Sequence, residues 1–168
     1  MNKYMNLIGI KARKASAKKI NTTIKNKVLN NYADLLAKEK KSILRENIKD
    51  VKFSKNRGLK ENLINRLCIN EEKIKEIRNS INKISKLKDP VNVNLEKWSR
   101  PNGLNISKVS IPIGVIGVIY ESRPNVTSDI SSLCFKSGNA VILKGGSEAI
   151  NTNRILTKLF RKALKINK

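Results

Sequence analysis

The sequence predicts an α/β fold: an amino-terminal helical region, then a β-hairpin, then the start of a parallel sheet that is incomplete. Three observations predict it. Apolar residues recur at helical spacing as far as Leu87, the spacing changes to strict alternation after Pro90, and two uncharged apolar runs then each precede a helical pattern. A chain of 168 residues is long enough for one hydrophobic core.

The helical region is expected to span residues 1–90. Apolar residues alternate with lysines at helical spacing over residues 6–20, and Asn21 with the two threonines after it can cap a second helix. A break is expected near Lys40. The apolar stripe of this second segment consists of Ile24, Val28, Leu29, Tyr32, Leu35, Leu36, Ile43 and Leu44.

Two further helices are predicted before the pattern changes. Gly58 interrupts the second segment, and a short helix should follow it with apolar residues Leu59, Leu63, Ile64 and Leu67. Asn70, followed by two glutamates, is a favourable helix start because acids stabilise the positive end of the helix dipole. Asp89-Pro90 should end this last helix. Its apolar face is Ile74, Ile77, Ile81, Ile84 and Leu87.

Residues 91–168 are expected to hold a hairpin and a partial β-α-β-α unit. Alternating apolar and polar residues predict strands at Val91–Trp98 and Leu104–Ile111, joined by the Arg-Pro-Asn-Gly turn between them. Two parallel strands should follow, at Val115–Tyr120 and Ala140–Leu143. The β-branched run of the first predicts a strand buried on both faces, in the centre of a sheet covered by helices on each side.

The helix between these strands is expected to open at Pro124 and to end at the Ser-Gly-Asn sequence that starts at Ser137. Its apolar face is predicted to be Val126, Ile130, Leu133 and Cys134. After the second strand, Gly145-Gly146 should turn the chain into a final helix.

The formal charge of +23 first suggests a nucleic-acid-binding protein without enzymatic activity. The charge is not concentrated on one motif, however. Residues 109–150 carry three bases and three acids, and the lysines before them follow helical patterns without an aromatic stacking platform. Solvated lysine faces are therefore preferred, and nucleic-acid binding stays the alternative.

Several classes of site and location are disfavoured. Histidine is absent and the two cysteines are far apart, so we expect no metal, no disulfide framework and no Ser-His or Cys-His nucleophile pair. No apolar stretch reaches the ~18–20 residues of a membrane span, and the first residues do not form a secretory signal. We expect a cytoplasmic chain.

The first candidate site follows the first parallel strand, at Glu121-Ser122-Arg123-Pro124-Asn125. Ligands of open parallel sheets collect at the carboxyl ends of the strands. The amide of Asn125 could donate a hydrogen bond to a developing oxyanion. The alternative, favoured by the residues alone, is that Asn125 and Ser122 only cap the helix.

The second candidate site is Lys144-Gly145-Gly146-Ser147-Glu148, after the second strand. A lysine there can reach phosphate or ribose, paired glycines let a ligand approach the backbone, and the following helix should offer free N–H groups to an anion. The alternative is a glycine turn with a solvated lysine. Cys134 and Cys68 each have apolar neighbours and no activating base, so both are predicted to be core thiols.

Taken together, the residues of both candidate sites indicate a protein family more specifically than either site does alone. The stretch PIGVIGVIYESRPNVTSDISSLCFKSGNAVILKGG, with NRGLKENLINRL and KLKDPV before it, closely resembles the γ-glutamyl phosphate reductase (glutamate-5-semialdehyde dehydrogenase) family of the aldehyde dehydrogenase superfamily. The resemblance covers nearly the whole chain. It implies the start of a Rossmann-like, aldehyde dehydrogenase-like sheet beside an amino-terminal helical region.

The resemblance also implies an activity: reduction of L-glutamate 5-phosphate to the 5-semialdehyde by NADPH, with release of phosphate, in proline biosynthesis. A cysteine attacks the acyl phosphate in this family. By position, Asn125 is similar to the oxyanion-binding amide, and Lys144 to the group that meets the adenosine ribose or its 2′-phosphate. Gly145, Gly146, Ser147 and Glu148 would complete that part of the cofactor site.

The chain departs from the family in length, since members are more than twice as long and carry the nucleophilic cysteine in a part that this chain lacks. The catalytic domain is therefore expected to be absent, and two strands leave the edge of a sheet open. We expect a fragment with little or no reductase activity alone. Its expected partners are L-glutamate 5-phosphate and either a homo-oligomer or the missing carboxyl-terminal part.

Overall fold

The computed structural model describes residues 3–121 and 123–167. In chain order its elements are α1 (Lys3–Ser16), α2 (Thr22–Lys38), α3 (Lys40–Asn56), α4 (Glu61–Leu67), α5 (Glu71–Lys86), β1 (Asn94–Ser99), β2 (Asn105–Val109), β3 (Val115–Ile119), α6 (Pro124–Lys136), β4 (Ala140–Lys144), a 3₁₀ turn (Ser147–Ala149) and α7 (Ile150–Ile166). The predicted order of helices, hairpin and parallel strands is confirmed.

Local signals set the helix ends as the sequence predicts. The side chains of Asn21 and Asn70 accept hydrogen bonds from the backbone N–H groups of Ile24 and Lys73, each at 2.8 Å, and so cap α2 and α5. The break near Lys40 falls at Glu39, between α2 and α3. These caps satisfy N–H groups that the first helical turn leaves unpaired.

A hydrophobic core forms between α2, α3, α5, α6 and α7, which we call the helical core. The predicted stripes of α2 and α5 are buried in it, except for the terminal residues Ile24 and Leu87, which are exposed. Tyr32 meets Phe160 edge to face, with ring centroids 5.0 Å apart. Helices from before and after Pro90 thus share one core.

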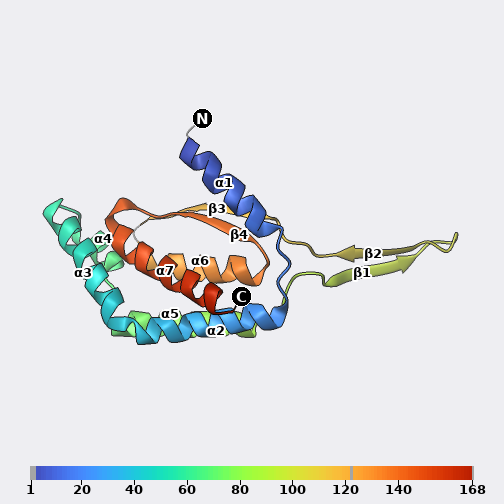
Figure 1. Ribbon diagram of the computed structural model, residues 1–168, viewed down its shortest axis with the longest axis horizontal. Helices are drawn as coiled ribbons and strands as arrows, with labels where there is room; N and C mark the ends of the chain where they lie inside the picture. Colours follow the sequence, from blue (N-terminus) through green and yellow to red (C-terminus); the bar gives the residue numbers. More distant parts are fainter. Residues whose placement is uncertain (1–2, 122, 168) are drawn as a thin grey trace.

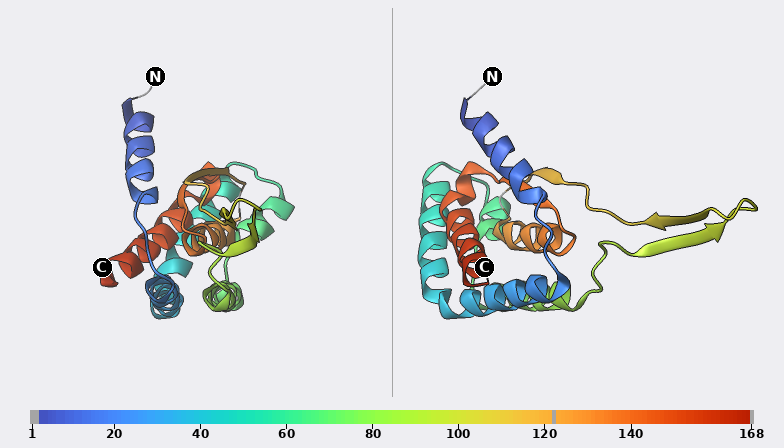
Figure 2. Two further views of the ribbon diagram at one scale, coloured as in Figure 1. Left: turned by 90° about the vertical axis from the view of Figure 1, so that its right-hand side faces the viewer. Right: turned by 45° about the vertical axis from the view of Figure 1, so that its right-hand side comes forward.

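The parallel strands β3 and β4 lie between two layers of helices, with α1 on one side and α6 on the other (Figure 1). Below α6 and α7, α2 and α5 form the outermost layer. The antiparallel hairpin of β1 and β2 extends away from this body as a long arm (Figure 2). Its turn needs Gly103, whose φ of 83° is in the left-handed region that favours glycine.

The prediction that the first parallel strand is buried on both faces is wrong. No residue of β3 is buried. Ile113, just before the strand, is 83% exposed, and Ile119, its last residue, is 82% exposed. The physical reason is that the described sheet has only two strands, so that β3 has an open edge, and α1 covers only part of one face.

The predicted face of α6 is also wrong, apart from Cys134. Leu133 is exposed and Val126 and Ile130 are half-buried. The helix instead buries a face of small polar residues against the helical core: Thr127, Ser128, Ser131 and Ser132. Small side chains let the helices approach closely. Hydrogen bonds such as that between the hydroxyls of Ser128 and Tyr32 (2.7 Å) compensate for burial, except at Ser132, whose Oγ has no partner among the described residues.

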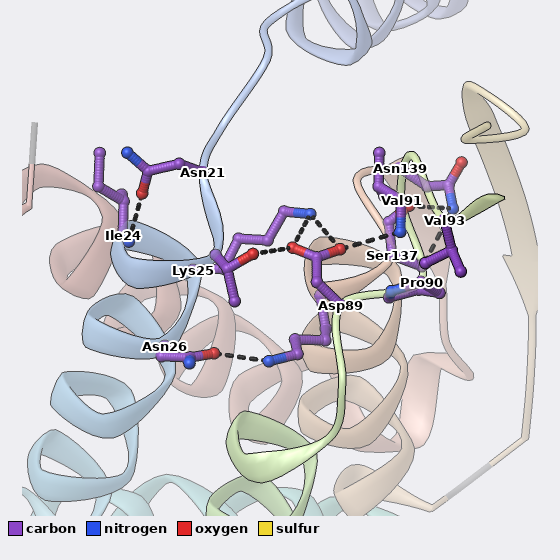
Figure 3. A network of polar contacts seen from close by, with 12 residues as sticks. Asn21, Ile24, Lys25, Asn26, Asp89, Pro90, Val91, Val93, Ser137 and Asn139 are labelled. Atoms are coloured by element: carbon purple, nitrogen blue, oxygen red, sulfur yellow. Dashed lines mark hydrogen bonds and ion pairs between the residues drawn. The ribbon is translucent and has the colours of Figure 1, made fainter. Parts of the chain in front are cut away.

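Two lysines depart from the expected solvated faces, since Lys25 and Lys136 are each only 2% exposed. Lys25 donates to both carboxylate oxygens of Asp89, at 3.0 and 2.8 Å (Figure 3). Lys136 donates to Asn26 Oδ1 and to the backbone oxygen of Ser85. Burial lowers the pKa of Lys136. These contacts tie α2, the end of α5 and α6 together.

Candidate functional site

Strands β3 and β4 bring the two predicted site segments to one edge of the sheet. They pair in parallel from Val115↔Ala140 to Ile119↔Lys144, and the N–H of Tyr120 donates to the backbone oxygen of Lys144 at 3.1 Å. Their carboxyl ends are therefore neighbours, as predicted. Asn125 follows the end of one strand and Lys144 ends the other.

Asn125 is the second residue of α6, behind Pro124. It does not cap the helix: the N-cap residue is Arg123, and no side-chain cap is seen among the described residues, which exclude Ser122. Among the described residues, the amide Nδ2 of Asn125 contacts only Asp129 Oδ2, at a long 3.4 Å. Since good N–H···O bonds are about 2.7–3.2 Å, this exposed amide keeps donor capacity for a ligand.

A pocket of about 380 Å³ opens beside Asn125, between α4, α5 and the first turns of α6. Its lining carries charges of both signs: Arg66, Cys68, Ile69, Lys73, Glu76, Ile77, Ser80, Pro124, Asn125 and Asp129. Sequence reasoning missed this pocket, because its residues come from three helices and follow no single motif.

Lys144 is exposed at the end of β4, and its side-chain ammonium makes no hydrogen bond or ion pair with the rest of the described chain. The first of the two glycines after it has an internal packing reason to lack a side chain, whereas the neighbour of the second is a flexible side chain that can move. A Cβ on Gly145 would clash with the side chains of Asn153 and Tyr120, and one on Gly146 would clash with the carboxylate of Glu148. Glu148 thus folds back over the turn, where Ser147 Oγ lies 3.4 Å from its carboxylate.

A buried polar chain that the sequence did not reveal lies under this edge. The hydroxyls of Tyr120 and Thr127 are 2.6 Å apart, and Thr127 donates to Asn153 Oδ1 at 2.8 Å. Burial raises the pKa of Tyr120, and its bond to Thr127 opposes that shift. The chain joins the end of β3 to the first turns of α6 and α7, and so fixes the geometry of the edge.

The expectation of free N–H groups at the start of the last helix is wrong. The 3₁₀ turn delays α7 until Ile150, and the buried carboxylate of Asp50, from α3, then accepts from the N–H groups of Asn151 (3.1 Å) and Thr152 (2.7 Å). A carboxylate of the protein already occupies the position that an anionic ligand would take at this helix end.

The two cysteines differ. Cys134 is buried as predicted, and burial raises the pKa of its thiol, which disfavours a thiolate nucleophile. Cys68 is only half-buried, so its prediction as a core thiol is wrong. It follows the last residue of α4, where the helix ends, and lines the pocket beside Asn125.

Neither a metal centre nor a membrane span is seen in the described part of the chain. Residues 3–121 and 123–167 contain no group of three or more cysteines and acids placed to hold a metal ion. None of their helices is long and apolar enough to cross a membrane.

No protein-family model matches the chain. Curated relatives do match it. It is 48% identical over 155 residues to a γ-glutamyl phosphate reductase of Caldanaerobacter subterraneus, which covers 91% of this chain and 37% of the relative. It is 44% identical over 161 residues to that of Clostridium tetani, with 95% and 38% covered. The chain thus spans little more than a third of the length of these relatives.

Comparison with solved structures gives the same relatives as the sequence comparison. The γ-glutamyl phosphate reductase of Thermotoga maritima superposes with a TM-score of 0.89 at 42% identity, over 92% of this chain and 38% of that one. The enzyme from Saccharomyces cerevisiae gives 0.87 at 34% identity, with 92% and 40% covered. An NAD-dependent benzaldehyde dehydrogenase of Corynebacterium glutamicum, at 0.70 and 21% identity over 90% and 31%, shows the fold alone. The chain is therefore similar in sequence and in fold to the amino-terminal portion of γ-glutamyl phosphate reductases, and it shares its fold with an aldehyde dehydrogenase.

Proposed function

We propose that this chain forms the amino-terminal part of an enzyme that reduces L-glutamate 5-phosphate to L-glutamate 5-semialdehyde, releasing phosphate, in proline biosynthesis. The observation that carries the proposal is the 44–48% identity to curated γ-glutamyl phosphate reductases over about nine tenths of the chain. No relative reported above is named as a nucleic-acid-binding protein, so nothing favours that alternative.

The residues with proposed roles lie at the carboxyl ends of β3 and β4. The Asn125 amide, whose contact to Asp129 is long at 3.4 Å, would donate to the oxyanion that forms when a nucleophile attacks the acyl phosphate. The nucleophile would come from the part of the enzyme that these residues do not include, because Cys134 is buried with a raised pKa.

The proposed cofactor is NADPH, which would supply hydride to the acyl group. The residues present fit one end of such a molecule: Lys144 is a solvent-exposed cation with no partner in the described chain, at the carboxyl end of a parallel strand. Ser147 Oγ and the Glu148 carboxylate, beside Gly145 and Gly146, would accept hydrogen bonds from ribose hydroxyls. In this proposal residues 91–168 hold the hairpin and a partial dinucleotide-binding unit, and residues 1–90 the supporting helical region.

The proposed macromolecular partner is a polypeptide equivalent to the remaining part of the relatives, in an enzyme that further assembles as a homo-oligomer. The apolar residues that would be covered include Ile111 and Ile113, just before β3, and Ile119 at its end, all largely exposed. Apolar surface that gathers in one exposed patch marks interaction sites.

Coexpression tests the proposal. The 168-residue chain alone should not reduce NADP with the semialdehyde, whereas the chain coexpressed with the carboxyl-terminal remainder of the Thermotoga maritima reductase should copurify with it and restore activity. In that complex Asn125→Ala should lower kcat about 10²–10³-fold, as removal of an oxyanion donor does. Lys144→Gln should mainly raise KM for NADPH, with the exposed hairpin variant Lys97→Gln as the control. A copurified complex without activity would contradict the proposal.

A further inference from the structure

The pocket beside Asn125 has the size and the charges of a binding site for a small zwitterion. Its volume of about 380 Å³ lies within the roughly 300–1,000 Å³ of small-molecule sites. Two cations, Arg66 and Lys73, and two anions, Glu76 and Asp129, line it together. A simple anion or a simple cation would meet like charges in such a pocket, whereas a molecule with both charges would not.

The cations are not equivalent. Lys73 is committed to the protein, because its ammonium donates to the backbone oxygens of Cys68 (2.8 Å) and Asn65 (3.2 Å) at the end of α4. The side chain of Arg66 is exposed, and its guanidinium has no hydrogen bond or ion pair to any residue that the structure describes. Its planar guanidinium can bind a carboxylate with two parallel hydrogen bonds.

Asp129 is the better placed anion. Its Oδ1 accepts a hydrogen bond from Ser80 at 2.9 Å, which orients the carboxylate, while from the described residues Oδ2 receives only the long contact of Asn125. A carboxylate can accept about four hydrogen bonds, so Asp129 has capacity left for a charged donor. Glu76, on α5, adds a second negative charge to the same pocket.

We propose that this pocket binds the α-ammonium and α-carboxylate groups of the amino-acid substrate, with Asp129 as the partner of the ammonium and Arg66 as the partner of the carboxylate. The inference rests on the proposed function, since it places the reacting acyl end at Asn125. The α groups then extend between α4 and α5. Asp129 and Arg66 would therefore determine specificity for an amino acid over a plain dicarboxylate.

A titration of the full chain, followed by the backbone amide resonances, tests the inference with L-glutamate as the probe. L-glutamate should shift amides of α4, α5 and the first turns of α6. Glutarate, which lacks the ammonium, and 4-aminobutyrate, which lacks the α-carboxylate, should each bind at least about tenfold more weakly, because each loses a charge-assisted hydrogen bond.

Variants assign the two contacts. Asp129→Asn should weaken L-glutamate binding about tenfold or more and leave the binding of glutarate, which has no ammonium group, unchanged. Arg66→Gln should also weaken L-glutamate binding about tenfold or more, and it should leave the binding of 4-aminobutyrate, which has no α-carboxylate, unchanged. Asp34→Asn and Arg45→Gln are matched controls, since both residues are exposed and lie outside the pocket. Unchanged amide spectra without ligand would establish that each variant is folded.

Absence of L-glutamate shifts in this pocket, or equal binding of all three ligands, would overturn the inference. A parallel titration with NADPH separates this failure from that of the proposed function. Shifts around Lys144 that Lys144→Gln abolishes would support the cofactor role, whatever L-glutamate does.

Discussion

The helical core and the two-stranded sheet belong to one chain, yet the helical core buries its apolar side chains and the sheet leaves many of them exposed. Leu29 and Ile81 of the helical core are fully buried, while Ile113 and Ile119 beside and within β3 are largely exposed. The helical core is complete within the described residues, because the apolar faces of α2, α5 and α7 pack against other helices of the chain. The two-stranded sheet is not covered in this way, although the apolar, β-branched composition of β3 is typical of a strand that is buried on both faces.

The largest expected effect contrasts a buried and an exposed isoleucine. Ile81→Ala should lower the free energy of unfolding by about 2–5 kcal/mol, because it leaves a cavity in the helical core. Ile113→Ala removes the same atoms from an exposed site and should change it by less than about 0.5 kcal/mol. Urea denaturation followed by circular dichroism measures both. Equal losses would mean that the sheet is covered in solution.

A smaller effect should come from the buried ion pair that holds the helical core to the hairpin arm. Asp89→Asn should destabilise the chain by about 2–3 kcal/mol at neutral pH, because the ammonium of Lys25, which is almost fully buried, then lacks its counter-charge. The same urea titration detects it. Asp34→Asn, at an exposed site, is the control and should have no comparable effect.

The pH dependence of this pair has a defined sign. Burial alone would raise the pKa of Asp89, but hydrogen bonds from Lys25, Thr22 and the backbone of Val91 outweigh burial and lower it below its ordinary value of 3.8. The folded state therefore binds fewer protons near that pH than the unfolded state. The stabilisation should be present above pH 3.8 and be lost as the pH falls through the lower, folded-state pKa. Asp89→Asn should remove this acid-dependent loss, and a variant with an unaltered acid profile would contradict the assignment.

The smallest effect in this series should come from the contact that anchors the site edge to the helical core. Asp50→Ala leaves the N–H groups of Asn151 and Thr152 without their acceptor and should cost about 1–3 kcal/mol. Amide hydrogen exchange should become faster in the first turn of α7 while the middle of α2 stays protected. Uniform loss of protection would show that α7 and the helical core open as one unit.

Local sequence signals determined the elements and their order. Asn21 and Asn70 cap their own helices, Gly103 turns its own hairpin, and the parallel strands could be placed next to each other from their runs alone. The positions of Asn125 and Lys144 at neighbouring strand ends follow from the same reasoning. Each of these features depends on residues close together in the chain, so a short stretch of sequence is enough to predict it.

Only the tertiary structure decided what each element packs against. The apolar pattern of α6 predicts the wrong face, because α2, α5 and α7 select the small polar face that fits their spacing. Asp50 occupies the N-terminus of α7 from a hundred residues away, and the pocket at Asn125 combines three helices. Such features arise from shape and charge between distant segments, which periodicity along the chain does not encode.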